Sequence, residues 1–358
     1  MRTRISSAPL AGAVALIAAA AAAHLAAARP ATAHRAGPTP AAAHRAATAS
    51  AAQARPVFAI GDQKPSLFTD PRVPWLGVRY ARLIVPWDVM LSPSELAAVD
   101  LWMAGAQRRQ IAPLVAFDQS VQSPRMLPTP AQYLRQFLAF QARYPWVHDY
   151  TPWNEENLHY KPIARHPGDA ALYFNVLSAH CPGCNVVAAD LLDLPNMVRY
   201  ARDVALLANN PKLWGVHNYI DVNTYSTRTT QKLLAAVKGT IWFTEVGGVV
   251  WRRDRHKGLV VDGEQRAAHA ARWIFHLAGL SPRIRRIYYY QWRSVISLAH
   301  ARSVRTATWD SGLIDSTGLP RPAFDVIAHM LGRDPRRAPR APIPPRRLQV
   351  GVPSGVTA

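Results

Sequence analysis

The stretch Thr151-Pro-Trp-Asn-Glu-Glu-Asn157 places an amide beside two carboxylates, directly after a short aromatic and β-branched run. Glutamate is rarely buried without a partner, and an adjacent aromatic ring raises the pKa of a carboxyl group by displacing water from it. Trp153 and Tyr150 are rings of this kind, and such surroundings keep an acid protonated near neutral pH. The ordinary alternative is that Glu155 and Glu156 begin a solvated loop or helix.

A second carboxylate bears on the choice between these two interpretations. Glu245 lies in the stretch Ile241-Trp-Phe-Thr-Glu-Val-Gly-Gly248, and it follows Glu155 by 90 residues (245 − 155 = 90). The two carboxylates can act together only if the fold brings them together. Whether it does so depends on the fold that the rest of the sequence predicts.

Short apolar runs alternate with longer segments of helical period. The predicted strands are residues 57–60, 80–85, 111–116, 147–151, 185–189, 213–217, 240–244 and 287–291. The predicted helices are residues 93–109, 130–144, 169–180, 196–209, 229–238 and 263–280, with no helix or a very short one between the first two strands. Such alternation predicts βαβ units and a parallel sheet. Eight strands between residues 57 and 331 predict an α/β fold, a single (β/α)8 TIM barrel.

The competing α/β fold is a doubly wound sheet, which usually carries a glycine-rich phosphate loop after an early strand. The sequence contains neither G-x-G-x-x-G nor G-x-x-x-x-G-K-[ST]. In addition, polar residues follow the C-terminal end of every predicted strand, which is the end where a barrel builds its active site. They include Asp62, Asp88, Asp118, Glu155, Asp190, His217, Glu245 and Gln291.

The two glutamates fit one reaction in particular. Cleavage of a glycosidic bond needs a proton for the leaving oxygen and a negative charge that balances the positive charge at the anomeric carbon. Two carboxyl groups supply both, and in the retaining geometry they stand about 5–5.5 Å apart. The fourth and seventh strands of an eight-stranded barrel lie roughly opposite each other, so we expect Glu155 and Glu245 to face each other across a cleft.

Two motifs carry a family resemblance. Trp153-Asn-Glu155 after the fourth predicted strand and Phe243-Thr-Glu245-Val-Gly247 after the seventh resemble the signatures of clan A retaining glycoside hydrolases, which include cellulases, xylanases and β-xylosidases. The resemblance covers most of residues 56–331, and Trp309-Asp-Ser-Gly-Leu-Ile-Asp315 is similar to the closing segment of such barrels. It implies hydrolysis of O-glycosyl bonds in a β-linked glycan by double displacement, as in polysaccharide degradation, without a cofactor or metal.

The resemblance also implies roles for individual residues. Glu155 takes the role of general acid/base, Asn154 binds the 2-hydroxyl of the sugar, and Glu245 takes the role of nucleophile. Glu156 is a bystander in this assignment, and an exchange of roles with Glu155 is the alternative.

Further supporting residues follow from the same resemblance. Arg82 on the second strand matches the arginine that supports the nucleophile, with Arg79 as its rival. His217 and Tyr219 follow the sixth strand, and Tyr219 is expected to form a hydrogen bond with Glu245.

Several aromatic and acidic residues on the same predicted face have two interpretations each. Trp292 after the eighth strand is expected to stack on the sugar, with core packing as the alternative. Trp87 and Trp251 either bind substrate or pack loops. Asp118 and Asp190 are candidates for substrate contact.

The only two cysteines stand in Cys181-Pro-Gly-Cys184. In a secreted chain this spacing predicts a local disulfide, whereas in the cytoplasm it is typical of redox chemistry or of half a zinc site. No second cysteine pair completes a four-cysteine zinc site. The sequence thus predicts a disulfide and no metal.

The N-terminal segment indicates where the protein acts. Arg2 and Arg4 precede an alanine-rich apolar run, and Ala31-Thr-Ala33 follows it. This pattern predicts a secretory signal peptide over residues 1–33, with an uncleaved signal anchor as the alternative. Residues 34–55 and 332–358 are predicted to be a disordered linker and a disordered Pro/Arg-rich tail around a domain at 56–331. The protein is therefore expected to be secreted or anchored at the cell surface.

The chain has 42 Lys and Arg against 22 Asp and Glu, a formal net charge of +20. No nucleic-acid-binding motif accompanies this charge, so nucleic acid is not a predicted partner. The predicted partners are an oligo- or polysaccharide substrate and an anionic cell-wall polymer. A membrane is a predicted partner only if the signal segment is uncleaved. The protein is expected to be a monomer. The charged segment 251–258 could form a lid, and its basic residues could favour an acidic glycan. The alternative functions are an inactive barrel that binds cell-wall glycan and an Arg-rich surface protein that binds polyanions.

Overall fold

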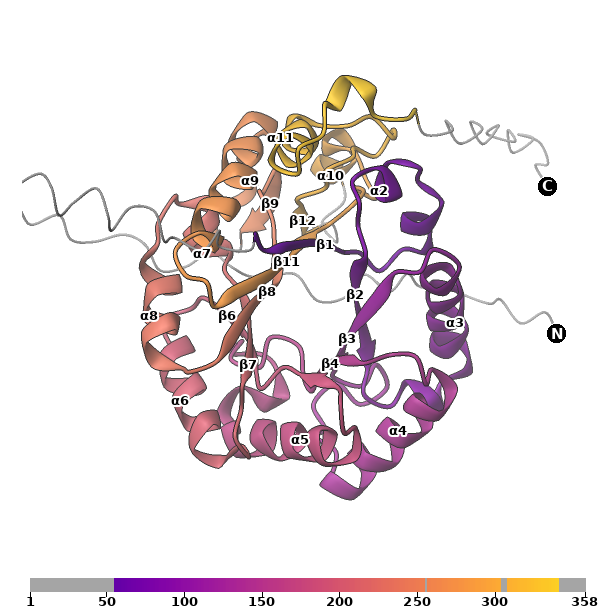
Figure 1. Ribbon diagram of the computed structural model, residues 1–358, viewed down its shortest axis with the longest axis vertical. Helices are drawn as coiled ribbons and strands as arrows, with labels where there is room; N and C mark the ends of the chain where they lie inside the picture. Colours follow the sequence, from indigo (N-terminus) through magenta and orange to yellow (C-terminus); the bar gives the residue numbers. More distant parts are fainter. Residues whose placement is uncertain (1–54, 255, 304–307, 341–358) are drawn as a thin grey trace, which may run out of the picture.

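The computed structural model describes residues 55–254, 256–303 and 308–340 (Figure 1). The predicted signal segment, residues 34–54 of the predicted linker and residues 341–358 of the predicted tail lie outside the described residues. None of the described helices has both the length and the hydropathy needed to span a membrane.

Nine parallel strands form one sheet in the order β5-β4-β3-β2-β1-β11-β8-β7-β6. They are β1 (Val57–Gly61), β2 (Tyr80–Pro86), β3 (Ala112–Asp118), β4 (Asp149–Thr151), β5 (Asn185–Val186), β6 (Asp190–Leu192), β7 (Leu213–His217), β8 (Thr240–Val246) and β11 (Ile284–Tyr290). β5 covers the start of the predicted fifth strand (residues 185–189), and β6 begins directly after its predicted end. Between them, the N–H of Val187 donates to the carbonyl of Tyr150 and that of Ala188 to the carbonyl of Leu213, so the sheet closes on itself. The predicted (β/α)8 barrel is confirmed, and Figure 1 shows the ring of strands.

Helices surround this ring (Figure 1). The longer ones are α3 (Pro93–Arg108), α4 (Pro130–Arg143), α5 (Pro167–His180), α6 (Met197–Leu207), α8 (Arg228–Ala236), α9 (Glu264–Ala278) and α11 (Pro322–Met330). The short ones are η1 (Pro65–Thr69), α2 (Arg72–Trp75), η2 (Val89–Leu91), η3 (Pro162–Arg165), α7 (Tyr219–Asn223), α10 (Leu298–Ser303) and η4 (Pro335–Arg337). Proline begins α3, α4, α5 and α11 because the first helical N–H needs no helical partner. Only η1 and α2 lie between β1 and β2, as the sequence predicts.

A layer of side chains from different strands fills the barrel interior. Its members are Ala59, Tyr80, Leu114, Val187, Leu213, Trp242 and Tyr288. The Arg286 guanidinium lies 3.9 Å from the ring centroid of Tyr80 and 3.8 Å from that of Trp242, and it forms an ion pair with Asp149. Because Tyr80 and Asp149 begin their strands, this layer occupies the N-terminal part of the barrel. The polar residues that end the strands are left at the opposite end.

A small antiparallel sheet, absent from the predicted elements, follows β8. It consists of β10 (Gly258–Val261), β9 (Trp251–Asp254) and β12 (Trp309–Asp310), in that order. Trp251 is buried in a cluster with Val250, Ala267 and Ala301, so of its two interpretations the packing role matches the structure. Arg252 pairs with Asp262 in this region. The density of charged residues at 251–258 concealed the strands, because charge is typical of exposed loops.

The structured region continues past the predicted boundary at residue 331. The N–H of Arg333 donates to the carbonyl of Ala328, η4 follows, and Ala338 packs against the core. The part of the predicted tail that the structure describes is therefore folded onto the barrel. Cys181 and Cys184 form the predicted disulfide, directly after α5.

The Arg286–Asp149 pair provides a test of the barrel interior. Arg286→Met leaves the Asp149 carboxylate buried, with Asn185 as its remaining side-chain partner. Because an uncompensated buried charge is costly, we expect the free energy of unfolding to fall by about 3–5 kcal/mol in urea denaturation. The control is Arg285→Met, an exposed residue of the same strand. Equal effects of the two substitutions would contradict the argument.

Candidate active site

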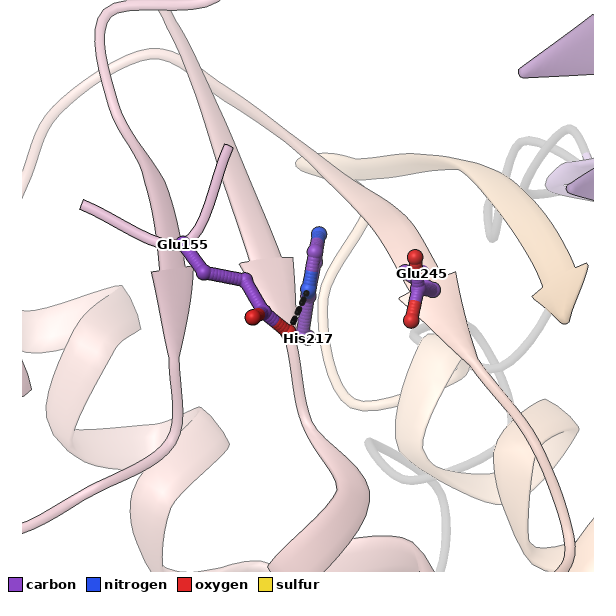
Figure 2. A group of neighbouring side chains, drawn as sticks. All are labelled: Glu155, His217 and Glu245. Carbon is purple, nitrogen blue, oxygen red and sulfur yellow. Dashed lines mark hydrogen bonds and ion pairs between the residues drawn. The ribbon is translucent and has the colours of Figure 1, made fainter. Parts of the chain in front are cut away.

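Three of the predicted site residues converge at the C-terminal end of the barrel (Figure 2). Glu155 follows β4, His217 ends β7 and Glu245 lies in β8. One carboxylate oxygen of Glu155, one of Glu245 and a ring nitrogen of His217 all lie within 4.8 Å of one another. Both glutamates are buried, with 2% and 1% of their surface exposed. The fold thus joins two carboxyl groups that are 90 residues apart.

A β-bulge directs Glu245 into the barrel. In the pairing of β8 with β11, Phe243 lies opposite Ile287 and Val246 lies opposite Tyr289, so three steps along β8 match two along β11. In a regular strand Glu245 would face the same side as Phe243, which packs in the core beneath the helices. The extra residue lets Thr244 and Glu245 both face the interior, where Thr244 donates to Asp190.

Glu155 is held by a strained backbone. Its φ is +54°, a left-handed conformation that costs a non-glycine residue about 1–3 kcal/mol. The N–H of Asn154 donates to the carbonyl of Phe117 at 2.7 Å, and the N–H of Glu156 donates to the carbonyl of Asp190 at 3.2 Å. These hydrogen bonds fix the residues on both sides. Glu155 therefore turns toward the interior.

Arg82 connects the site. Its guanidinium is fully buried, and Nη1 donates to Glu245 Oε2 at 2.7 Å. Nη2 donates to Asn154 Oδ1 at 2.6 Å and to Asp190 Oδ2 at 2.7 Å. Tyr219 donates its hydroxyl to Glu245 Oε1 at 3.0 Å, the hydrogen bond that the resemblance implies. Each oxygen of Glu245 thus has one donor.

His217 and Asp190 form a charged pair beside Glu155. His217 Nδ1 lies 3.2 Å from Glu155 Oε1, and Nε2 lies 3.2 Å from Asp190 Oδ1. Burial lowers the pKa of His217, but the negative charges of Asp190 and Glu245 outweigh it and raise the pKa to about 9. Burial raises the pKa of Asp190, whereas His217 and Arg82 lower it to a net value below its ordinary range. The raised pKa favours the protonated ring, in which Nδ1 donates to Glu155 and Nε2 donates to Asp190.

Gly215 in β7 makes room for this pair. A Cβ at that position would lie 2.5 Å from Asp190 Oδ1 and 2.8 Å from Thr244 Oγ1. Any larger residue would therefore displace Asp190 from His217 and Arg82.

The surroundings of Glu245 raise its pKa on balance. Burial is the largest cause, His217 and Arg82 oppose it, and the nearby Glu155 adds to it. Glu155, His217 and Glu245 have the donor atoms of a metal site. Both ring nitrogens of His217 already have carboxylate partners, Glu155 at Nδ1 and Asp190 at Nε2, and this arrangement suits acid–base chemistry.

Some predicted residues lie away from the carboxylates. Trp292 donates its indole N–H to Asp70 and packs edge-to-face on Phe324, so in this structure it occupies the core position that was its alternative interpretation. Trp87 is buried in the core beneath the helices. Arg79 is exposed, which leaves Arg82 as the arginine at the nucleophile.

The aromatic rings expected to desolvate Glu155 also point outward. Trp153 stacks on Tyr173 of α5, and Tyr150 stacks on Phe117 within the same core. The expectation that these rings surround Glu155 was wrong. The residue itself is buried by the strand ends and the loops that follow them.

Two tyrosines near the carboxylates, Tyr290 and Tyr160, are not among the site residues predicted from the sequence. Burial raises the pKa of Tyr290, and so do the charges of Glu245 and Glu155, so its hydroxyl lies within their electrostatic reach. The same causes, with Asp118, raise the pKa of Tyr160. Strand alternation gave a signal for Tyr290, because Tyr288 on the same strand faces the interior.

The closing segment reaches the site through Tyr219. Trp309 of β12 packs edge-to-face on Tyr219, with ring centroids 5.0 Å apart. Leu158, Leu192 and Val249 complete this apolar cluster. The small sheet thus supports the tyrosine that donates to Glu245.

Glu156 lies apart from Glu155 although it is the next residue. It is fully buried, and neither carboxyl oxygen has a hydrogen-bond partner among the described residues. Burial raises the pKa of Glu156 well above its ordinary value, and the charge of Asp190 adds to the shift. Its surroundings therefore favour the protonated, neutral form of Glu156.

The pKa of His217 predicts how stability depends on pH. The folded value of about 9 exceeds the ordinary value of 6.5, so the stabilisation is complete below about pH 6.5 and is lost as the pH rises through 9. We expect His217→Asn to remove this part of the decrease in the free energy of unfolding. Denaturation between pH 6 and 10 measures it, with His269→Asn on the exposed face of α9 as control. Parallel pH profiles for wild type and His217→Asn would exclude a charged His217.

The raised pKa of Glu156 also predicts how stability depends on pH. Above its ordinary pKa of 4.5 the unfolded chain releases the proton and the folded chain keeps it, so stability falls as pH rises. Glu156→Gln should raise the free energy of unfolding at pH 7 and flatten that decrease. Thermal unfolding at pH 4 and pH 7 tests this, and a larger gain at pH 4 than at pH 7 would contradict it.

The comparisons with known proteins concern the fold. No family model matches this sequence, and a search of curated proteins finds no match. Among solved structures, a GH39 β-xylosidase from Caulobacter crescentus matches with a TM-score of 0.56 and 16% identity, over 78% of this chain and 72% of that one. Xylanase B from Clostridium stercorarium F9 matches with a TM-score of 0.56 and 13% identity, over 76% of this chain and 96% of that one.

A third solved structure agrees with these two. Xylanase 10B from Thermotoga maritima matches with a TM-score of 0.57 and 10% identity, over 78% of this chain and 96% of that one. At such identities the likeness concerns the backbone arrangement. The chain therefore has a clan A-like glycoside hydrolase fold, a (β/α)8 barrel.

Proposed function

We propose that this protein is a secreted retaining O-glycoside hydrolase that cleaves a β-linked glycan by double displacement. The observation that carries the proposal is the approach of Glu155 and Glu245, whose nearest ligand oxygens lie within 4.8 Å. Retaining enzymes hold their carboxyl groups about 5–5.5 Å apart, and inverting enzymes about 6.5–9.5 Å apart. The shorter distance leaves no room for a water molecule between nucleophile and sugar.

In the first step, a carboxylate oxygen of Glu245 attacks the anomeric carbon. Arg82 and Tyr219 each hold one oxygen of this carboxylate and so orient it. The bond between the anomeric carbon and the leaving oxygen breaks, and its electron pair takes a proton from Glu155. Glu155 Oε2 has no partner among the described residues, so this oxygen is free to carry that proton. The product is a covalent glycosyl ester of Glu245.

In the second step, Glu155 acts as a base. Its carboxylate takes a proton from water while the water oxygen attacks the anomeric carbon, and the ester bond to Glu245 breaks. The Nδ1–H of His217 faces Glu155 Oε1 at 3.2 Å and stabilises the carboxylate in this step. Two inversions give net retention of configuration. Every proton and electron pair is accounted for without a cofactor.

The similar folds indicate which substrates to test first. The matching structures are those of β-xylosidases and xylanases, so β-xylosides and xylan are the first substrates to test. A polysaccharide substrate fits an enzyme outside the cytoplasm, as the N-terminal sequence predicts. Detection of the protein in the culture medium or on the cell surface tests that part.

Substitution of each carboxyl group tests the mechanism. On aryl β-glycosides, we expect Glu245→Gln to lower kcat by at least about 10⁴-fold because the nucleophile is lost. Glu155→Gln should lower kcat by about 10²–10⁴-fold. The loss of kcat should be smaller for substrates whose aryl group leaves without a proton. NMR of the first product should show the β-anomer.

Glu156→Gln is the matched control, because it changes the neighbouring carboxyl group, which has no hydrogen bond to His217. It should retain activity close to that of the wild type. Near-wild-type hydrolysis by Glu245→Gln would remove the assignment. Glycan binding without cleavage by the wild type would favour the inactive barrel, and salt-sensitive binding of an anionic polymer alone would favour the polyanion-binding protein.

A further inference from the structure

A buried ion pair lies next to the proposed site without a role in the mechanism. Asp118 ends β3, and Lys161 lies in the loop after β4. Lys161 Nζ is 2.6 Å from each carboxylate oxygen of Asp118, and the residues are only 3% and 6% exposed. Burying two charges is costly, and an apolar pair of similar volume is often at least as stable. A stability role alone therefore explains this pair poorly.

The pair contacts Asn154, the residue matched to recognition of the 2-hydroxyl. Asn154 Nδ2 donates to Asp118 Oδ2 at 3.3 Å, and Asn154 Oδ1 accepts from Arg82 Nη2 at 2.6 Å. The side-chain amide therefore has an acceptor on one side and a donor on the other. If it flipped, its NH₂ group would face the guanidinium and its oxygen would face the carboxylate. Asp118 and Arg82 together permit a single orientation.

One N–H of the amide stays available. Among the described residues, Asn154 Nδ2 has Asp118 as its only hydrogen-bond acceptor, and an amide nitrogen carries two protons. The backbone of Asn154 is already fixed by its hydrogen bond to Phe117. The direction of the second N–H thus depends on the two hydrogen bonds of the planar amide, one to Asp118 and one from Arg82.

Lys161 keeps Asp118 in the state that this arrangement requires. A buried carboxylate without a cation takes up a proton or turns toward water. A carboxylate that turned toward water would leave Asn154 Nδ2 without its acceptor. The lysine thus stabilises the acceptor form of the carboxylate.

We propose that Asp118 and Lys161 are positioning residues that orient the Asn154 amide so that its free N–H recognises the hydroxyl next to the anomeric carbon of the bound sugar. This inference rests on the proposed function. It predicts that the preference of the enzyme for substrates with a free 2-hydroxyl group depends on Lys161, which lies outside both motifs. The pair acts through Asn154.

The test compares an aryl β-glycoside with its 2-deoxy counterpart. For Lys161→Met, we expect kcat/KM to fall roughly tenfold on the 2-hydroxy substrate, the effect of losing one buried hydrogen bond, and to stay nearly unchanged on the 2-deoxy substrate. Lys161→Arg keeps the cation and should restore the preference. Lys232→Met on the exposed face of α8 is the matched control. In an Asn154→Ala background, Lys161→Met should have no further effect on the preference.

The outcomes separate the two proposals. An equal loss on both substrates, or an unchanged preference in an active enzyme, would overturn the positioning role and leave the glycosidase assignment intact. A wild type that cleaves neither substrate would overturn the assignment itself. If circular dichroism shows that Lys161→Met does not fold, the double variant Asp118→Leu/Lys161→Met decides. It removes both charges and both carboxyl oxygens, so Asn154 Nδ2 has no acceptor and the same preference must be lost.

Discussion

The buried positive charge of Arg82 is the constraint on which the catalytic end of the barrel depends. A charge taken out of water costs several kcal/mol unless ion pairs and hydrogen bonds compensate it. Arg82 on β2 meets this need with Glu245 from β8, Asp190 from β6 and Asn154 from the loop after β4. One side chain thus fixes three distant parts of the chain. Stability and the geometry of the site are therefore coupled.

Asp190 contacts both Arg82 and His217, which also lie 3.3 Å from each other. These two groups lower the pKa of Asp190, and its charge in turn helps to raise the pKa of His217 to about 9. The protonated His217 in turn faces Glu155. The opposite end of the barrel is filled mainly by apolar and aromatic side chains, so the polar network is confined to the strand ends where substrates bind in barrels of this kind.

Much of the fold could be predicted because apolar periodicity is a local property. All eight barrel strands were located, although the fifth extends past its predicted end. The parallel arrangement then required the strand ends that carry Glu155, His217 and Glu245 to meet. The prediction failed where local periodicity stops. Strand alternation ends at Tyr290 and says nothing about the direction of Trp292. The sequence favoured Trp292 for stacking on the sugar, whereas in this structure it contacts Asp70 and Phe324 in the core. The hairpin of β9 and β10 was hidden by charged residues.

The sequence by itself determined the order of strands and helices, the barrel that follows from it, and the two motifs with their glutamates. Only the tertiary structure decided which neighbours those glutamates have. Glu155 faces His217, whereas the adjacent Glu156 is buried without a hydrogen-bond partner among the described residues. Likewise, Lys161 became part of the site only through its contact with Asp118. The physical reason is that secondary structure follows from neighbours in sequence, whereas burial, pairing and protonation depend on charges brought close by the fold.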